Sequence, residues 1–339
     1  MRFRHLVSTL LTAAALSMSG AASAKTILKF SIGAPESVGG EILGMKALKE
    51  YVEFKSGGEI EIRLFFNTFG GSLQVTEQVK NGTLEMALTD DSVLGSFHKP
   101  MQVFQIPYLF PSSPVAWEFM KSPFVRELNE DMRKATGIRT LALSENGFRN
   151  LTNNTREIKS PDDLKGLKMR TMQSQVYVNF MKSMGAAATP IAFPELVTSL
   201  KQGVVDGQEN AASTVWDGKL FEVQKFMSVN EHIYGLHFII INDKVFQGLS
   251  PDMRQVLMDG AAVHAEVANS RKAMDNMQSI QKIRGAGTKV YVNTPTEKES
   301  FRKASQEPVI EFIASQVGRP VVDKLLKAVR ETTRDSYAN

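Results

Sequence analysis

Two arginines, Arg149 and Arg170, are the residues whose chemistry is most distinctive. Both lie at or just before apolar, strand-like runs within residues 147–210 rather than on a solvated helix face. A guanidinium group that is partly removed from water needs an anionic partner, and its planar shape suits two parallel hydrogen bonds to a carboxylate. An internal salt bridge or a surface position is the alternative for each, because charged residues are rarely buried unpaired. If no acidic side chain satisfies these arginines, a ligand must.

Few other side chains could hold a metal ion. His232 and His237 lie five positions apart and are not expected on one helix, so a metal pair is not predicted. Asp90 and Asp91 could join a cation site, but adjacent acids in a loop are more often solvated. With no cysteine and no hydrolase, zinc-protease or phosphate-loop motif, the sequence predicts neither a metal site nor a cofactor.

The chain begins like an exported protein. Residues 1–24 carry Arg2 and Arg4, then a short apolar run, then the small residues Ala22-Ser23-Ala24. This pattern is typical of a cleaved signal peptide, with Lys25 as the expected first residue of the mature protein. We therefore expect a periplasmic protein. No later stretch is long and apolar enough to span a bilayer, so we expect no direct membrane anchor.

Composition favours a soluble globular protein with a large core. The chain has 339 residues, of which 42% are hydrophobic and 22% are charged. That length suggests two lobes. Removing Arg2 and Arg4 with the signal peptide, which contains no acid, reduces the net charge from +4 to +2. A nearly neutral mature chain gives no electrostatic case for binding nucleic acid.

The first part of the mature chain alternates between strand and helix patterns. Apolar residues at every second position indicate strands, and a 3.6-residue period indicates helices. The predicted elements are a strand at 26–32, a helix at 40–54, a strand at 59–64, a short helix from 72 to 81 and a strand at 84–88. This β-α-β-α-β series favours a parallel or mixed sheet with helices on its faces.

The remainder continues in the same style, with a second lobe expected to begin near Gly147. Residues 79–85 resemble residues 200–206 in sequence, which fits two lobes built on one plan. Further predicted elements are a packed crossover at 104–110, a helix at 114–135, strands at 138–143, 167–171, 233–242 and 288–292, and helices at 174–184, 194–203, 251–285, 295–317 and 321–333. With no long linker, several chain crossings between the lobes are expected.

A set of motifs distributed over the chain resembles one family. The motifs are Gly147-Phe148-Arg149, the run 163–170 (DLKGLKMR), Phe193-Pro194-Glu195, the run 205–210 (VDGQEN) and the run 221–226 (FEVQKF). In this order and spacing, they resemble the solute-binding protein of a tripartite ATP-independent periplasmic (TRAP) transporter, of the dicarboxylate-binding type. Lys29-Phe30, 79–87 and 106–110 match in the first lobe, so the resemblance covers essentially the whole mature chain.

The resemblance implies an α/β fold of the two-lobed periplasmic binding protein class. Each lobe would hold a mixed sheet flanked by helices, and the lobes would close about a hinge with a long helix bridging both. The expected division is lobe I at 25–146 plus about 235–275, lobe II at 147–234 plus about 276–305, and C-terminal helices at about 306–339 packing across the lobes. Ala211 stands where the family often has proline, and Phe69 where leucine is usual.

The resemblance also assigns roles to residues. Arg170 falls at the family's main carboxylate-binding arginine and Arg149 at a supporting arginine. Asn210 corresponds to a ligand-contacting asparagine and Phe193 to an aromatic residue that lines the cleft. Asp90 aligns with a position that contacts hydroxyls in sugar-acid binders.

Three further residues are weaker candidates for the ligand site. His237 lies near another cleft-lining position. Trp216 and Phe221 have helix spacing that favours the core, although Trp216 is kept as a cleft candidate. Glu36 is a further ligand-binding candidate and would also be an acid–base candidate if the cleft performed chemistry.

The predicted function is capture of an organic-acid anion, either a sugar acid, a hydroxy acid or a C4-dicarboxylate, for delivery to the small and large TRAP membrane subunits. The protein is expected to be a monomer and not an enzyme. One alternative is an exported lyase or dehydratase acting on a carboxylate, for which Asp90, His237 and Glu36 are the only acid–base candidates. Another is a ligand-sensing co-receptor for a membrane kinase.

Overall fold

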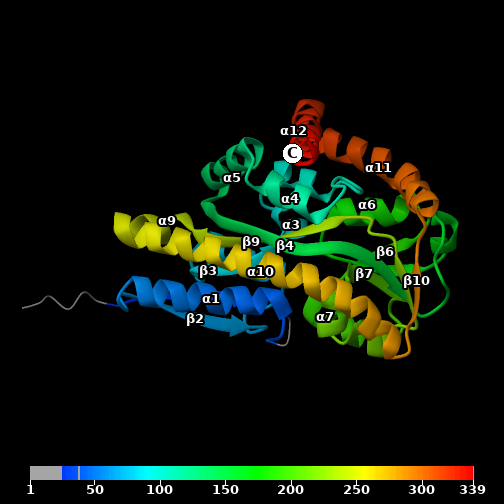
Figure 1. Cartoon of the computed structure of the whole chain (residues 1–339), viewed down its shortest axis with the longest axis horizontal. Helices are drawn as coiled ribbons and strands as arrows, with labels where there is room; N and C mark the ends of the chain where they lie inside the picture. The colour runs from blue at the N-terminus through cyan, green and yellow to red at the C-terminus, as the bar shows by residue number, and fades with distance from the viewer. Residues whose placement is uncertain (1–24, 37–38, 339) are drawn as a thin grey trace, which may run out of the picture.

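The computed structural model describes residues 25–36 and 39–338, so the predicted signal peptide lies outside the described residues. A continuous mixed sheet forms the centre of the molecule, with helices on both faces (Figure 1). Its strand order is β2-β1-β3-β9-β4-β7-β5-β6, with β8 pairing to β4 and β10 pairing to β8. The predicted α/β class is confirmed.

The first half of the sheet follows the predicted β-α-β-α-β order. Its strands are β1 (Thr26–Ile32), β2 (Ile60–Phe66) and β3 (Met86–Asp90), with α1 (Gly39–Lys55) and α2 (Ser72–Asn81) as connections. β1 runs parallel to both β2 and β3, as short helical crossovers require. Alternate β1 side chains, among them Leu28 and Phe30, are buried against α1 in an apolar core.

The strand β4 (Ile138–Asn153) joins the two halves. The sequence predicted a strand ending at residue 143, but β4 extends to Asn153 and has 16 residues in all. It pairs with β9 (Tyr234–Asn242) as far as Phe148 and with β7 (Gly207–Ala211) from Arg149 onward. Gly147, at a register shift, adopts a φ of +113° that glycine tolerates and other residues avoid. The glycine therefore bends a continuous strand instead of ending it.

The second half of the sheet contains four shorter strands in addition to β7. They are β5 (Lys168–Thr171), β6 (Ala187–Pro190), β8 (Phe226–Val229) and β10 (Lys289–Val292). The connecting helices are α6 (Gln175–Ser183), α7 (Phe193–Lys201) and α8 (Ala212–Asp217). β5 runs parallel to β6 and β7, which gives this half the same strand–helix–strand construction as the first.

A single helix of 35 residues, α10 (Pro251–Gly285), bridges both halves. It runs along α1 at one end (Figure 1) and packs against α8 at the other. The approach to α1 is close, because a Cβ atom at Gly44 would lie 2.7 Å from Nδ1 of His264. The predicted bridging helix is thus confirmed, as one helix without a break.

One sequence prediction about the helices was wrong. The helix expected at 114–135 is two helices, α4 (Ser113–Met120) and α5 (Pro123–Thr136), because Ser122 caps a new helix with proline in its first turn. A 3₁₀ turn spans Pro161–Leu164, with Ser160 as its N-cap. Other short elements are α3 (Asp91–Leu94), α9 (Asp243–Gly248) and 3₁₀ turns at Lys99–Gln105 and Leu220–Val223.

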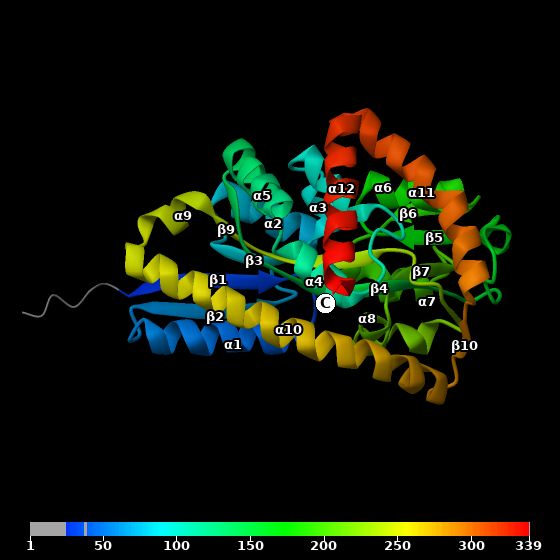
Figure 2. The ribbon, with the colours of Figure 1, turned by 45° about the horizontal axis from the view of Figure 1, so that its top comes forward.

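The chain ends in two helices, α11 (Pro295–Val317) and α12 (Arg319–Tyr337). α11 packs on α6, while α12 turns back onto α4 and α5 (Figure 2). The lobe boundaries predicted near residues 275 and 305 fall inside α10 and α11, so the division into lobes stays a prediction. Over the described part of the chain, no helix is long and apolar enough to cross a membrane.

Candidate ligand-binding site

A cavity lies where the carboxyl ends of β1 and β3 from one half face those of β5 and β6 from the other. This edge of parallel strands is where α/β sheets usually bind ligands. The cavity contains about 680 Å³ of space not filled by protein atoms, part of it open to solvent. Five predicted site residues line it: Asp90, Arg170, Phe193, Asn210 and His237.

Arg170 on β5 is buried in the cavity wall with a nearly uncompensated charge. Its Nε donates to the carbonyl oxygen of Ile191 at 2.8 Å, and its Nη1 is buried with no hydrogen-bond partner among the described residues. Burial lowers the pKa of Arg170 to about 10, although the charge of Glu209 opposes this and that of Arg149 adds to it. The guanidinium therefore has free donors for an anion.

Asn210 and Phe193 lie beside this arginine in the cavity lining. Asn210 is the fourth residue of β7 and pairs with Asn150 across the strands. Its Nδ2 donates to Oε1 of Gln208 at 3.2 Å. Phe193 is the first residue of α7, so its ring is presented by the start of a helix that begins with Phe-Pro. Arg170, Asn210 and Phe193 thus form the wall contributed by the second half of the sheet.

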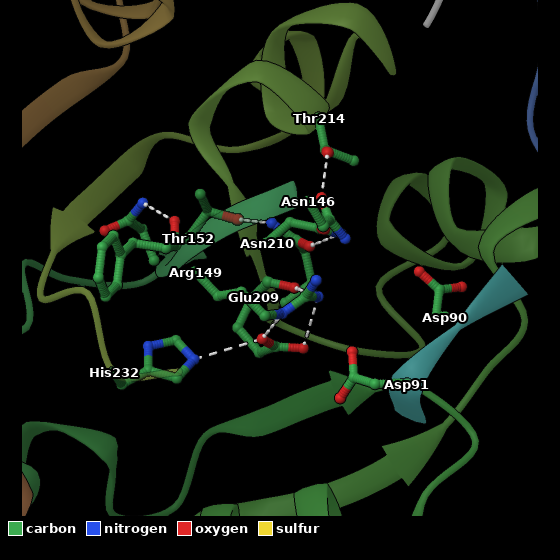
Figure 3. Close-up of polar contacts among 12 residues, drawn as sticks. Asp90, Asp91, Asn146, Arg149, Thr152, Glu209, Asn210, Thr214 and His232 are labelled. Carbon is green, nitrogen blue, oxygen red and sulfur yellow. Dashed lines mark hydrogen bonds and ion pairs between the residues drawn. The ribbon is translucent and has the colours of Figure 1, made fainter. Parts of the chain in front are cut away.

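Arg149 differs from Arg170 because it has an internal partner. Its Nε and Nη2 lie 2.5 and 3.0 Å from the two carboxylate oxygens of Glu209, and both side chains are fully buried (Figure 3). Burial alone would lower the pKa of Arg149, but Glu209 outweighs this effect and raises it. Arg149 is not part of the cavity lining. The salt-bridge alternative left open by the sequence is therefore the one realised for Arg149.

The Arg149–Glu209 pair continues to a buried histidine. Nε2 of His232 lies 3.3 Å from Oε2 of Glu209 (Figure 3), and Nδ1 of His232 lies 2.8 Å from Oδ1 of Asn230. Burial would raise the pKa of Glu209, but the charge of Arg149 and the hydrogen bond from His232 lower it. Burial lowers the pKa of His232. This network holds the end of β4 against β7 below the cavity.

The opposite wall of the cavity carries acceptors. Asp90 ends β3, its Oδ2 accepts from the Ser72 hydroxyl, and its Oδ1 lies 3.2 Å from Nε2 of His237 on β9. Burial acts to raise the pKa of Asp90, but the hydrogen bonds from His237 and Ser72 prevail and lower it to about 2. Asp90 is therefore ionised at neutral pH, and its carboxylate suits hydroxyl groups.

Asp91 is not solvated as the sequence pattern suggested. It is buried at the start of α3, where its Oδ1 accepts from the backbone nitrogen of Leu236 at 3.0 Å. Burial raises the pKa of Asp91 to about 7. No group of three or more metal-ligating side chains suited to a metal ion occurs within residues 25–36 and 39–338.

Besides Arg149, two further sequence candidates lie outside the cavity lining. Glu36 is exposed and accepts from Nζ of Lys46 at 2.8 Å. Trp216 stacks on Phe221, with 4.5 Å between ring centroids, within an apolar cluster, which matches the core interpretation. One lining residue that the sequence did not single out is Glu41 near the start of α1.

Comparison with protein-family models matches residues 35–316 to the bacterial extracellular solute-binding proteins of family 7. The chain belongs to this family, whose members bind solutes and are not enzymes. More particularly, it is a periplasmic solute-binding protein of the TRAP type. The lyase or dehydratase alternative is thereby excluded, and two of its three nominated residues belong instead to the cavity wall.

Individual relatives agree with this assignment. The chain is 29% identical over 332 residues to the 2,3-diketo-L-gulonate-binding periplasmic protein YiaO of Escherichia coli, covering 98% of this chain and 99% of the relative. It is 28% identical over 334 residues to the C4-dicarboxylate-binding periplasmic protein DctP of Rhodobacter capsulatus, covering 97% and 99%.

Two solved structures are similar throughout. The sugar acid binding protein of Advenella mimigardefordensis in complex with galactonate has a TM-score of 0.87 and 29% identity, covering 91% of this chain and 99% of that one. A TRAP periplasmic solute-binding protein of Polaromonas bound to D-erythronate has a TM-score of 0.84 and 31% identity, covering 89% and 98%.

Proposed function

We propose that this protein captures a hydroxylated monocarboxylate, a sugar acid, and delivers it to the small and large membrane subunits of a TRAP transporter. TRAP solute-binding proteins bind small organic acids and pass them to membrane components. The choice of a sugar acid over a dicarboxylate as the ligand is supported by the residues in the two walls of the cavity. The protein would act as a monomer that opens and closes about the strand β4.

The observation that carries the proposal is the uncompensated guanidinium of Arg170 in the cavity wall. A carboxylate that enters the cavity loses its hydration, and two parallel hydrogen bonds from Arg170 would replace it. The amide group of Asn210, in the same wall, would donate a further bond. Because Arg149 is already neutralised by Glu209, it would support Arg170 from behind instead of contacting the ligand.

The opposite wall supports the choice of a hydroxylated ligand. Asp90 is ionised, so its oxygens accept hydrogen bonds and repel a second carboxylate. His237 is fixed beside it at 3.2 Å and offers a polar ring edge. Phe193 would cover the carbon skeleton of the ligand. Solved relatives with galactonate and with D-erythronate carry ligands of this chemical type.

A thermal-shift panel tests the proposal. The purified protein is first unfolded and refolded to remove any bound acid, then mixed with D-galactonate, D-glucuronate, D-erythronate or succinate. A ligand at 100 times its dissociation constant should stabilise the protein by about 2.7 kcal/mol. We expect this stabilisation from at least one hydroxylated acid, and less from succinate. D-Galactose, which lacks the carboxylate, is the matched control and should have no effect. Tighter binding of succinate, or no response to any acid, would overturn the proposal.

A further inference from the structure

Glu41 has a free carboxylate oxygen in the wall of the cavity. The residue lies in the first turn of α1, is 1% exposed and lines the cavity beside Asp90 and His237. Its Oε2 is buried and has no hydrogen-bond partner among the described residues. Leaving a buried carboxylate oxygen without a donor costs free energy, so this atom needs an explanation.

The other oxygen of Glu41 is firmly held. Nζ of Lys272, on the bridging helix α10, lies 2.6 Å from Oε1 and donates to Oγ of Ser213 on α8 at 2.9 Å. Nδ1 of His237 lies 3.6 Å from the same Oε1. Lys272 is completely buried, so its charge cannot be met by water. These contacts fix the carboxylate with Oε2 as the atom left over.

Glu41 is kept ionised in this position. Burial acts to raise its pKa, but the charges of Lys272 and His237 and the hydrogen bond from Lys272 outweigh burial and lower the pKa. An ionised oxygen can only accept a hydrogen bond. The missing partner of Oε2 is therefore a donor, and a hydroxyl group of a molecule held in the cavity, which Glu41 lines, is such a donor.

A purely structural ion pair is the alternative. Buried pairs of this kind often contribute little net stability, and they join helices such as α1 and α10 without any ligand. That alternative accounts for Oε1 and for Lys272, but not for an unpartnered Oε2 in the lining of a cavity. It also leaves unexplained why a second acid, Asp90, occupies the same wall, since His237 lies between the two carboxylates.

We propose that Glu41 is a specificity-determining residue whose Oε2 accepts a hydrogen bond from a hydroxyl group of the bound acid, at the end remote from Arg170. Lys272 positions this oxygen but does not touch the ligand. With Asp90, Glu41 makes the remote end of the cavity fit hydroxyl groups and exclude a second carboxylate. This inference rests on the proposed function and adds the residue that selects the remote end.

The test compares acids that share a carbon skeleton and differ at the remote end. Each hydroxylated acid is paired with its diacid: D-galactonate with galactarate, D-gluconate with D-glucarate, and D-erythronate with meso-tartrate. Calorimetric titration is carried out for the pair that contains the tightest-binding acid. The ratio compared is the dissociation constant of the diacid divided by that of the hydroxylated acid. Glu41→Gln keeps the shape but replaces one acceptor oxygen with a donor. It should weaken the hydroxylated acid about tenfold or more while the diacid loses little, so the ratio falls.

Ser213→Ala is the matched control, because it removes the other partner of Lys272 without altering the cavity lining. It should lower the melting temperature and leave the ratio unchanged. If Glu41→Gln does not fold, Glu41→Asp keeps the charge, withdraws the carboxylate and should lower the ratio as well. An unchanged ratio in the folded Glu41 variant would overturn the inference while leaving the proposed function intact. A wild-type protein that binds none of the six acids would overturn both.

Discussion

Replacing Arg170 by methionine should abolish ligand binding and yet stabilise the ligand-free protein. Methionine fills similar volume but carries no charge. The arginine is 2% exposed, forms one hydrogen bond, to the carbonyl oxygen of Ile191, and has no ion-pair partner among the residues that the structure describes. A buried cation of this kind destabilises the folded state until an anion arrives.

The magnitude follows from the pKa of Arg170. Burial lowers this pKa from 12.5 to about 10. A folded-state pKa below the unfolded value means that folding disfavours the charged form. The penalty is fully present below pH 10 or so and fades as the pH rises toward the unfolded value. At neutral pH it amounts to roughly 3 kcal/mol, at about 1.4 kcal/mol per pKa unit. Losing the hydrogen bond to Ile191 destabilises the variant by about 1–2 kcal/mol. A net stabilisation of the ligand-free protein on the order of 1–2 kcal/mol therefore remains.

The assay measures two quantities on protein from which bound acids have been removed. The melting temperature of Arg170→Met at neutral pH should rise by roughly 2–4 °C. Titration with the acid that binds the wild type most tightly should give no measurable heat. Lys168→Met, which removes an exposed cation from the same strand, is the control and should change neither quantity much. A ligand-free variant that melts well below the wild type, or one that keeps its affinity, would refute the reasoning.

Two further changes probe the strand and the acid that border the site. Gly147→Ala should destabilise the protein by about 2–4 kcal/mol in urea unfolding, because φ is +113° and a Cβ atom would lie 2.3 Å from Nδ2 of Asn276. Gly57→Ala, at φ +59° with nothing within 4 Å, isolates the backbone term, and an equal loss in both variants would contradict the steric argument. Burial raises the pKa of Asp91 from 3.8 to about 7, so the stability contributed by its protonated form is lost as the pH rises through that interval. Asp91→Asn should therefore raise the melting temperature near pH 8 and hardly change it near pH 4, and a pH-independent shift would show that the charge is not the cause.

Local pattern was enough to predict the elements that enclose the site. The alternation in β1 and β2 and the helical period of α1 depend only on which side chains face the core, so they are visible in a short window. The short motifs around Arg170 and Asn210 likewise predicted that these residues belong to the ligand site, and both residues line the cavity. Their roles toward a ligand remain predictions.

Pairing over long sequence distances could not be predicted. The salt bridge of Arg149 depends on the register of β4 against β7, which sets Leu151 opposite Glu209, and no local signal fixes that register. In the sequence, Glu41 is an ordinary acidic residue in the first turn of a helix, where its negative charge interacts favourably with the helix dipole. Only the packing of α1 on α10 brings Lys272 to it and turns it into a buried acceptor.

The contrast between the two buried arginines explains how one fold separates stability from binding. Arg149 has its carboxylate within the chain, so its charge is paired whether or not a ligand is present. Arg170 has no such partner among the described residues. An acidic side chain beside it would offset the cost of burying its charge. That substitution would also close the site to anions. The destabilisation carried by the ligand-free protein is therefore the free energy that an entering carboxylate recovers. Because this cost is already present before binding, the entering carboxylate does not have to remove the arginine from water.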